Sequence, residues 1–323
     1  MEEKYFLSLR IYIYLYPMYE LVTILGPTAC GKTHLAVALA ARLKSEVISG
    51  DSRQVYRRMD IGTGKDLSEY TYEGRNVPYH LIDIVEPGSK YTLFHFQEDF
   101  LKAFRSIREC QRIPVFCGGS GLYLESVLKA FSLSPVPINE PLRASLSNKS
   151  LEELTSILAS FRPLHNNTDT DTCTRAIRAI EIETYNKEHP QELRSFPSIP
   201  SLVIGLDVDR EIRRQRIANR LEQRLKEGLV EEIRSLLESG VSADDLIYYG
   251  LEYRFVTLYV IGQMGYDEMV ERLRIAICQF AKRQMTWFRG MEKRGIHIHW
   301  IDNTMDTDSK VDAILSLLKH QTS

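Results

Sequence analysis

Short apolar runs alternate with longer segments of helical periodicity through much of the chain. Between the runs, apolar residues recur at helical spacing at Leu35, Leu39 and Leu43, and again from 96 to 107. Strands that alternate with helices predict a parallel sheet with helices on both faces, which is an α/β fold. The runs expected to form strands are 21–25, 46–49, 79–85, 114–117 and 202–208.

The pattern changes in the middle of the chain. Strand signals fade there, and two helical segments, 151–161 and 174–185, lie between the proline-rich strings SPVPINEP and FPSIP. We therefore expect a helical insertion at 129–197 that divides a core into two parts, 20–128 and 198–323.

After the insertion, the chain carries two long charged segments with helical periodicity, 210–239 and 266–294. An alternating run, 296–301, then predicts a half-buried strand. Residues 1–19 form an N-terminal extension whose apolar stretch is interrupted by charged residues and a proline, which argues against a membrane span.

Composition adds limits on partners and compartment. The formal net charge of -2 gives no global signal for a polyanionic partner, so a nucleic-acid surface has to come from local clusters of Arg and Lys. The five cysteines contain no CxxC pair, which argues against a disulfide framework or a structural zinc site. This cysteine use is typical of the reducing cytoplasm, and we take a monomer as the default expectation.

The string GPTACGKT after the first predicted strand matches the phosphate-binding pattern G-x-x-x-x-G-K-[ST]. In the strand-loop-helix context that the pattern requires, backbone N–H groups turn around phosphate oxygens, Lys32 adds a positive charge, and Thr33 is the expected ligand of Mg²⁺. The loop alone does not distinguish ATP hydrolysis, phosphoryl transfer and the holding of a diphosphate leaving group. The predicted diphosphate-binding residues are Gly26, Pro27, Thr28, Ala29, Cys30, Gly31, Lys32 and Thr33.

A carboxylate follows the second predicted strand, in the string SGDSRQVYRRMDIGTGK. The carboxyl ends of parallel strands share one edge of a sheet, so Asp51 is expected on the same edge as the phosphate-binding loop. A lone Asp after a strand is most often a turn or helix cap, so the residues around Asp51 decide its role.

Four strings in order along the chain, GPTACGKT, DSRQVYRRMDIGTGK, GGSGLY and KRQMTWFR, resemble the signatures of bacterial tRNA dimethylallyltransferases. The resemblance runs through nearly the whole chain and implies a parallel sheet like that of P-loop nucleoside-triphosphate hydrolases. It implies transfer of a dimethylallyl group from dimethylallyl diphosphate to N6 of the tRNA adenosine 3′-adjacent to the anticodon, which forms N6-isopentenyladenosine.

By the same resemblance, Asp51 is the general base, and Arg216 and Thr28 complete the catalytic set. An exocyclic amine is a poor nucleophile, and a carboxylate that accepts its proton lowers the barrier. The resemblance also implies contacts with the extruded base and the surrounding tRNA. The residues expected to make them are Asp51, Ser52, Arg53, Gln54, Ser120, Arg143, Arg175 and Arg178.

Two strings admit a structural interpretation beside the functional one. TRAIRAIEI, which holds Arg175 and Arg178, fits an amphipathic helix whose apolar face packs while its arginines bind. KRQMTWFRGMEKR clusters cationic residues around Trp287 and Phe288, which suits either RNA contact or a core position for the two rings. Family members usually carry glycine where this chain has Glu252, so contacts from that loop stay open.

Three other functions remain open on sequence alone. The nearest is an adenylate isopentenyltransferase, which would use a free nucleotide as acceptor; the helical insertion with Arg143 and Arg178 favours tRNA. A small-molecule kinase or ATPase would need a strand-end aspartate for magnesium, for which Asp83 is the tempting candidate. An RNA-binding module without catalysis would not need Asp51 as a base.

Overall fold

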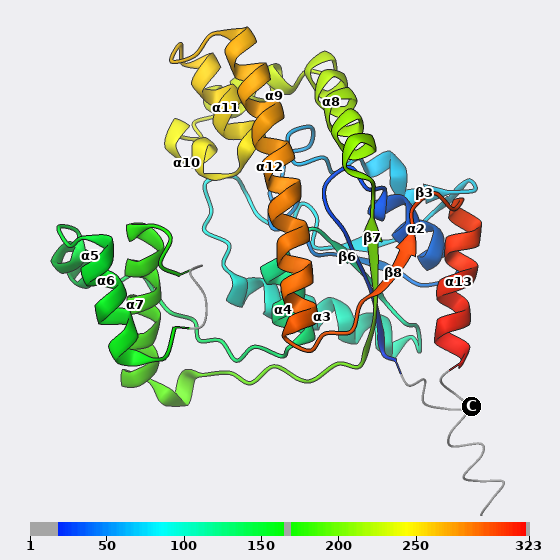
Figure 1. Cartoon of the computed structure of the whole chain (residues 1–323), viewed down its shortest axis with the longest axis horizontal. Coiled ribbons are helices and arrows are strands. Elements are labelled where there is room, and N and C mark those ends of the chain that lie inside the picture. Colours follow the sequence, from blue (N-terminus) through cyan, green and yellow to red (C-terminus); the bar gives the residue numbers. More distant parts are fainter. Residues whose placement is uncertain (1–18, 165–168, 321–323) are drawn as a thin grey trace, which may run out of the picture. The chain divides into compact units, whose positions relative to one another are not determined.

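The computed structural model describes residues 19–164 and 169–320 (Figure 1). The chain forms two compact units: one comprises Met1–Lys129 with Ser198–Ser323, and the other is Ala130–Pro197. Apart from Tyr19, the predicted N-terminal extension lies outside the described residues. In the part of the chain that is described, no helix combines the length and the apolarity needed to cross a membrane.

The larger unit is built on a sheet in the order β5-β2-β6-β1-β7-β8, with each pairing parallel. The predicted parallel α/β fold is thereby confirmed. β5 is shorter than the predicted run because Leu81 and Asp83 have positive φ angles, which end an extended strand. The strands of this sheet are β1 (Leu21–Leu25), β2 (Val47–Ser49), β5 (Tyr79–His80), β6 (Val115–Gly118), β7 (Ser201–Asp207) and β8 (His299–Asp302).

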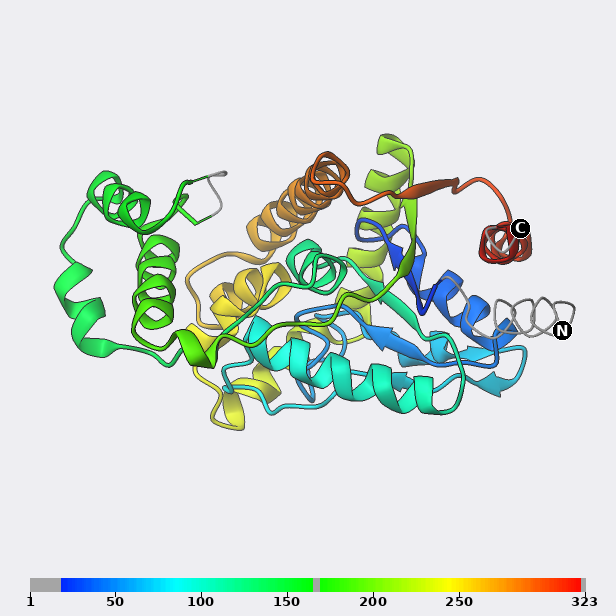
Figure 2. The ribbon, with the colours of Figure 1, turned by 90° about the horizontal axis from the view of Figure 1, so that it is seen from below.

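Helices connect these strands and cover both faces of the sheet. They are α2 (Lys32–Arg42), α3 (Leu93–Glu109), α4 (Gly121–Leu128), α8 (Arg210–Lys226), α9 (Leu229–Glu238), α10 (Ala243–Tyr248), α11 (Leu251–Val260), α12 (Tyr266–Lys293) and α13 (Thr307–His320). Figure 2 shows α2 and α13 side by side. Val115 and Cys117 of β6 share a core with these two helices, whereas Phe116 between them packs on Phe96 and Phe100 of α3. Side chains alternate between faces along a strand, so both faces of the sheet are buried.

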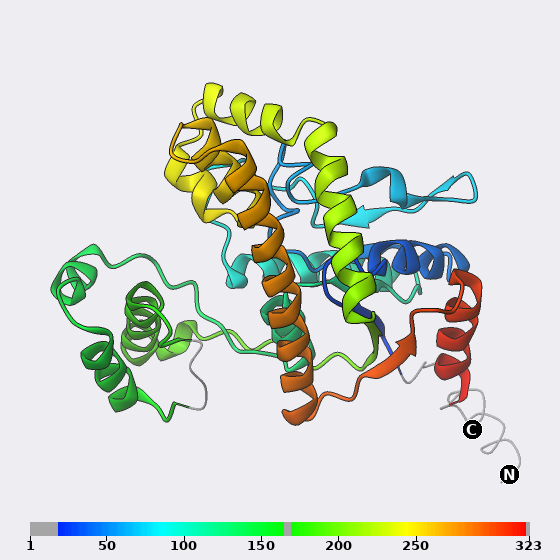
Figure 3. The ribbon, with the colours of Figure 1, turned by 45° about the horizontal axis from the view of Figure 1, so that its top comes forward.

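Helices α8 to α12 form a further layer, which α8 enters directly from the carboxyl end of β7 (Figure 3). This layer has its own apolar core, to which the segment after β2 contributes Val55, Tyr56 and Met59. Tyr253 of α11, with 1% of its surface exposed, belongs to the same cluster. The segment that follows Asp51 is therefore anchored by packing against this helical layer.

Some boundaries differ from the sequence prediction. The charged segment 210–239 forms two helices, α8 and α9, because Gly228 adopts a left-handed conformation (φ 104°) between them. The segment 266–294 forms α12 as predicted. A hairpin of β3 (Thr71–Tyr72) and β4 (Arg75–Asn76), as well as α10, α11 and α13, were not predicted.

The smaller unit is helical. Its helices are α5 (Glu140–Leu146), α6 (Leu151–Phe161) and α7 (Cys173–Glu188). α6 begins with a capping box, in which Ser150 and Glu153 satisfy each other's backbone N–H groups. The residues of its separate apolar core are Leu146, Leu154, Leu158, Ala176, Ala179 and Ile180.

Candidate active site

The loop between β1 and α2 has the geometry that its glycine pattern predicts. Gly31 lies in the left-handed region (φ 82°) immediately before α2, a conformation that glycine adopts without strain. A Cβ atom at Gly26 would lie 2.6 Å from Cys30 Sγ and 3.0 Å from the backbone oxygen of Leu206, so a side chain there would displace the loop. The loop thus delivers the positive end of the α2 dipole, together with Lys32, to the carboxyl edge of the sheet.

Gln284 of α12 ties this loop to the turn after β6. Its side-chain oxygen accepts a hydrogen bond from the Thr28 N–H (2.9 Å), and its side-chain nitrogen donates to the backbone oxygen of Gly119 (2.9 Å). The Thr28 N–H is therefore bonded within the chain, and contact of Thr28 with diphosphate stays a prediction. Sequence reasoning missed Gln284 because its partners are 256 and 165 residues away along the chain.

Glycines lie at close backbone contacts between the phosphate-binding loop and the segment that carries Asp51. β6 lies between β1 and β2 in the sheet, and its last residue, Gly118, begins the string GGSG. A Cβ atom at Gly118 would lie 2.5 Å from the backbone oxygen of Gly50, and one at Gly119 would lie 2.6 Å from Gln284 Nε2. The glycine turn after β6 and the Gln284 side chain bonded to it therefore lie between the phosphate-binding loop and the segment that carries Asp51.

The Asp51 segment adjoins the end of β6. The Arg53 N–H donates to Asp51 Oδ1 (2.8 Å), which fixes the rotamer of the carboxylate and leaves its second oxygen without a hydrogen bond in the described structure. The Ser52 N–H donates to Ser120 Oγ (3.1 Å), which joins this segment to the N-terminus of α4. The structure thus brings together four of the residues predicted to face the base: Asp51, Ser52, Arg53 and Ser120.

Gln54 has a different place from its neighbours. Its side chain is 9% exposed, and both of its polar atoms are bonded: Oε1 accepts from Ser49 Oγ (2.9 Å) and Nε2 donates to the backbone oxygen of Gly64 (3.0 Å). Ser49 Oγ in turn accepts from the Asp51 N–H (3.3 Å). Gln54 therefore supports the Asp51 segment through its bonds to Ser49 and Gly64, and its contact with a base stays a prediction.

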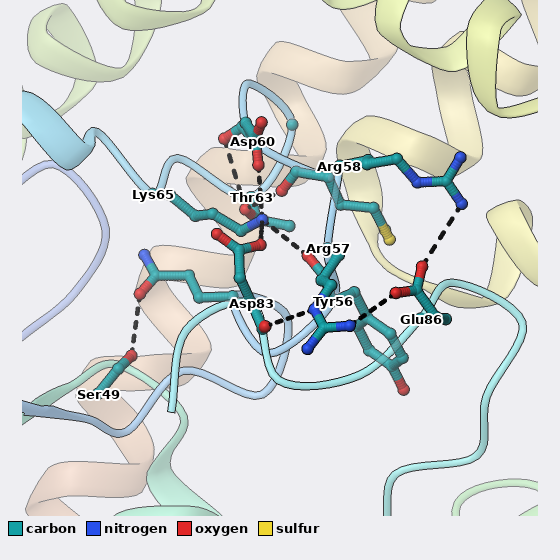
Figure 4. A network of polar contacts seen from close by, with 12 residues as sticks. Ser49, Tyr56, Arg57, Arg58, Asp60, Thr63, Lys65, Asp83 and Glu86 are labelled. Atoms are coloured by element: carbon teal, nitrogen blue, oxygen red, sulfur yellow. Dashed lines mark hydrogen bonds and ion pairs between the residues drawn. The ribbon is translucent and has the colours of Figure 1, made fainter. Parts of the chain in front are cut away.

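A buried lysine holds the rest of the segment after β2 in place (Figure 4). The Lys65 side chain has no exposed surface, and its ammonium donates to the backbone oxygen of Tyr56 (2.7 Å), to Asp60 Oδ1 (2.6 Å) and to Asp83 Oδ1. All three donors are used, so this cation is fully compensated. Asp83, the candidate magnesium ligand of the kinase interpretation, is thus paired with Lys65 and lies three residues after the end of β5, at the edge of the sheet.

Arginines at positions 216, 220 and 224 recur once per turn along α8. Arg220 forms an ion pair with Asp66 (2.9 Å), and Arg224 lies 3.5 Å from Glu252. Burial, followed by the charge of Arg220, lowers the pKa of Arg224, and burial raises the pKa of Glu252. Glu252, which replaces the glycine usual in the resembled family, therefore compensates a buried arginine, while Arg216 stays exposed.

The segment before α13 reaches the phosphate-binding loop from the other side. Asn303 Nδ2 donates to the backbone oxygen of Cys30 (3.3 Å), and the Lys310 ammonium donates to Asn303 Oδ1 (2.8 Å) and to its backbone oxygen (3.2 Å). Burial and then the charge of Arg216 lower the pKa of Lys310. Lys310 of α13 is thus linked through Asn303 to the loop whose end carries Lys32 of α2.

The sequence matches two models of known protein families. A family model described as IPP transferase matches residues 54–291, and one described as isopentenyl transferase matches residues 19–77. The tRNA dimethylallyltransferase 2 of Phocaeicola vulgatus is 60% identical over 300 residues, which cover 93% of this chain and 98% of that protein. The chain belongs to the IPP transferase family.

Solved structures of related enzymes have the same fold. A tRNA isopentenylpyrophosphate transferase from Bacillus halodurans superposes with a TM-score of 0.69 at 33% identity, over 94% of this chain and 96% of that one. A eukaryotic dimethylallyltransferase that acts on tRNA shares the fold, with a TM-score of 0.61 at 22% identity over 88% of this chain and 74% of that one. The P-loop-like α/β fold expected from the sequence is the fold of this IPP transferase family.

In the helical insertion of this family member, two of the predicted tRNA-binding arginines are bound internally. Arg143 donates to both oxygens of Glu181 (3.0 and 2.9 Å), and Arg178 pairs with the same carboxylate and with the backbone oxygen of Val136 (2.9 Å). Although burial opposes it, hydrogen bonds from Arg143, the Asn139 N–H and Arg178 lower the pKa of Glu181 to about 2. Both arginines therefore have a structural role, and tRNA contact stays a prediction.

Arg175 differs from these two arginines. It is exposed, and its ion-pair partner among the residues that the structure describes is Asp171, one turn away. Surface pairs of this kind are weak, so its guanidinium remains available to a phosphate.

The string KRQMTWFR has a divided role. Phe288 is fully buried, and Trp287 packs against Gly121, where a Cβ atom would lie 2.4 Å from the indole. Phe288 therefore serves the core, whereas Trp287 is half-buried and packs against the turn after β6. Lys282, Arg283 and Arg289 are exposed on the same helix.

Within the described residues, no cluster of His, Cys, Asp and Glu is suited to hold a metal ion. Thr33, in the first turn of α2, is partly exposed beside Lys32. Mg²⁺ commonly takes one or two protein ligands and completes its shell with water and substrate phosphates. A single hydroxyl at this position fits such a metal, which would arrive with the diphosphate.

Proposed function

We propose that this chain transfers the dimethylallyl group of dimethylallyl diphosphate to N6 of the tRNA adenosine 3′-adjacent to the anticodon, which forms N6-isopentenyladenosine. The observation that supports this most strongly is the placement of the phosphate-binding loop and Asp51 on one edge of the sheet, on either side of the strand β6 and its glycine turn. Relatives named tRNA dimethylallyltransferase, which match this chain over nearly their full length, support the same reaction.

In this proposal Asp51 acts as the general base. The N6 lone pair forms a bond to C1 of the prenyl group while the bond from C1 to the diphosphate oxygen breaks, and the N6 proton passes to Asp51. The oxygen of Asp51 that does not accept from Arg53 is the acceptor for this proton. A positioned carboxylate of this kind contributes about 10²- to 10⁴-fold to rate.

The phosphate-binding loop holds the leaving group. Negative charge grows on the diphosphate as the bond breaks, and Lys32, Arg216 and the N-terminus of α2 stabilise it without reorganisation. Thr33 would hold Mg²⁺ together with diphosphate oxygens, and the metal would supply further positive charge there. Burial and then the charge of Arg216 lower the pKa of Lys310, whose ammonium would add to the same field.

Recognition of the acceptor needs RNA contacts outside the sheet edge. We propose that the helical insertion, with Arg143, Arg175 and Arg178, contacts the tRNA, and that Ser52, Arg53, Gln54 and Ser120 lie near the extruded adenosine. Extrusion is required because the N6 amine of a stacked base is out of reach. We further propose that the protein works as a monomer in the cytoplasm, where tRNA is modified.

The acceptor is what separates this function from its nearest rival. Purified protein with Mg²⁺ and dimethylallyl diphosphate is incubated with unmodified tRNA or with AMP, and the digested product is identified by mass spectrometry. We expect prenylated adenosine in tRNA alone. Prenylated AMP alone would identify the protein as an adenylate isopentenyltransferase. ATP turnover without prenyl transfer would favour a kinase or ATPase.

A further inference from the structure

One aromatic side chain next to the candidate active site is unusually exposed. Tyr248, the last residue of α10, has 73% of its surface exposed, more than any other large apolar side chain in the described residues. A single exposed ring is common on protein surfaces, so its meaning depends on the groups around it.

The ring is held on a rigid base. Tyr249 contacts it edge to face (6.2 Å between centroids) and is itself 2% exposed. The ring of Tyr249 lies 4.4 Å from that of Tyr56, and its hydroxyl accepts a hydrogen bond from the Gly88 N–H (2.6 Å). The backbone that carries Tyr248 is thus fixed, so its exposed ring is presented at a defined place.

Arg53 connects this ring to the catalytic carboxylate. Its guanidinium carbon lies 5.4 Å from the centroid of the Tyr248 ring, which is within the range of a cation–π contact. The backbone N–H of the same residue donates to Asp51 Oδ1 (2.8 Å). No carboxylate of the described residues lies within ion-pair distance of Arg53, so its charge is not neutralised locally.

We propose that Tyr248 and Arg53 form a stacking platform for an unpaired nucleobase next to the adenosine that is modified. Single-stranded RNA loops are recognised largely by stacking of bases on aromatic rings and on the planar guanidinium of Arg. A phosphate would use the guanidinium but not the ring. The prenyl chain would need a covered apolar pocket rather than an exposed face, so a base is the ligand that fits both groups.

The position of the platform sets what it recognises. The Arg53 N–H bonds Asp51 and the Arg53 guanidinium contacts the Tyr248 ring, so the platform adjoins the proposed base and suits a nucleobase next to the one that reacts. It rests on the proposed function, because only an RNA acceptor has a neighbouring base to stack. A free nucleotide would gain nothing from it.

The test compares Tyr248→Ala with Tyr248→Phe in steady-state prenylation of tRNA. Loss of one stacked base is expected to raise KM for tRNA by about 5- to 150-fold, while KM for dimethylallyl diphosphate stays unchanged. Tyr248→Phe keeps the ring and is expected to behave as wild type. Tyr266→Ala, at another exposed tyrosine of the same unit (45% exposed), is the matched control and is expected to have no effect.

A wild-type KM for tRNA in Tyr248→Ala would overturn the platform, and so would an equal loss in Tyr248→Phe, because the hydroxyl would then carry the effect. Direct binding of an anticodon stem-loop RNA is measured beside turnover. Wild-type protein that binds this RNA without prenylating it would reject the proposed function, whereas the binding ratio of Tyr248→Ala to wild type would still decide on the platform.

Discussion

Lys65 is a buried cation with three partners, and it holds the segment between Tyr56 and Asp83 in shape. The string DSRQVYRRMDIGTGK predicted the position of Asp51 but not this lysine, because a lysine is read from sequence as a surface residue. The partners of Lys65 are a backbone oxygen and two carboxylates, of which Asp83 comes from the loop after β5, 18 residues away along the chain.

Lys65→Met is expected to destabilise the protein by about 1.5–3 kcal/mol, the range for hydrogen bonds to charged groups. Both carboxylates are partly exposed, so water recovers part of the loss. Urea unfolding followed by circular dichroism measures the effect. Lys102→Met, which removes a surface lysine paired with Asp99, is the control and should leave the midpoint unchanged. An unchanged midpoint in Lys65→Met would contradict the role assigned to it.

Helix α12 contributes to the site at the scale of an element. The charged periodicity of 266–294 predicted the helix, and its burial pattern confirms that Phe288 faces the core. Hydrophobic periodicity does not predict which loops a buried polar residue joins. Gln284 is 7% exposed and bonds two loops that belong to β1 and β6, so its role depends on sheet order.

Gln284→Ala is expected to lower kcat/KM for dimethylallyl diphosphate, because the phosphate-binding loop loses its connection to the turn after β6. KM for tRNA is expected to change little. Gln284→Glu keeps the acceptor for the Thr28 N–H but places a carboxylate oxygen against the Gly119 oxygen, so it should also be impaired. Gln215→Ala, at an exposed glutamine of α8, is the control. Equal loss for both substrates would indicate general unfolding instead.

Element boundaries show a similar division between what was predictable and what was not. The strands next to β1 were predicted within a residue or two because their apolar runs are continuous. The split at Gly228 and the short β5 depend on single backbone conformations, which hydrophobic periodicity does not encode. α10 and α11, which carry Tyr248 and Glu252, are short. They lie in a stretch rich in Tyr that shows neither the periodicity of a helix nor the alternation of a strand.

At the scale of the whole molecule, the chain consists of a parallel α/β unit and a helical unit, each with its own apolar core. The proline-rich strings at the ends of 129–197 predicted the division, since proline marks the connections between units. The internal bonds of Arg143 and Arg178 were not predictable, because their shared partner Glu181 was read as part of an amphipathic helix.

Glu181 makes the stability of the helical unit depend on pH. Its pKa is about 2 in the folded chain and about 4.5 when unfolded, so its contribution is fully present above about pH 4.5 and is lost as pH falls toward 2. Glu181→Gln is expected to lower the stability of this unit at neutral pH and to weaken its acid dependence. Glu152→Gln, at an exposed carboxylate of α6, is the control.

The two tryptophans, Trp287 and Trp300, both lie outside the helical unit, so circular dichroism reports on both units and tryptophan fluorescence on the larger one alone. We expect Glu181→Gln to shift the transition seen by circular dichroism and to leave the fluorescence transition in place. An acid dependence equal to that of wild type would contradict the pairing.

The central claim is that Asp51 accepts the N6 proton and does not serve binding alone. Single-turnover prenylation by Asp51→Asn is the most direct test, with equilibrium binding of tRNA and of dimethylallyl diphosphate measured in parallel. The account predicts a rate lower by about 10²- to 10⁴-fold with both binding constants nearly unchanged. A wild-type rate, or a loss explained entirely by weaker binding, would contradict it.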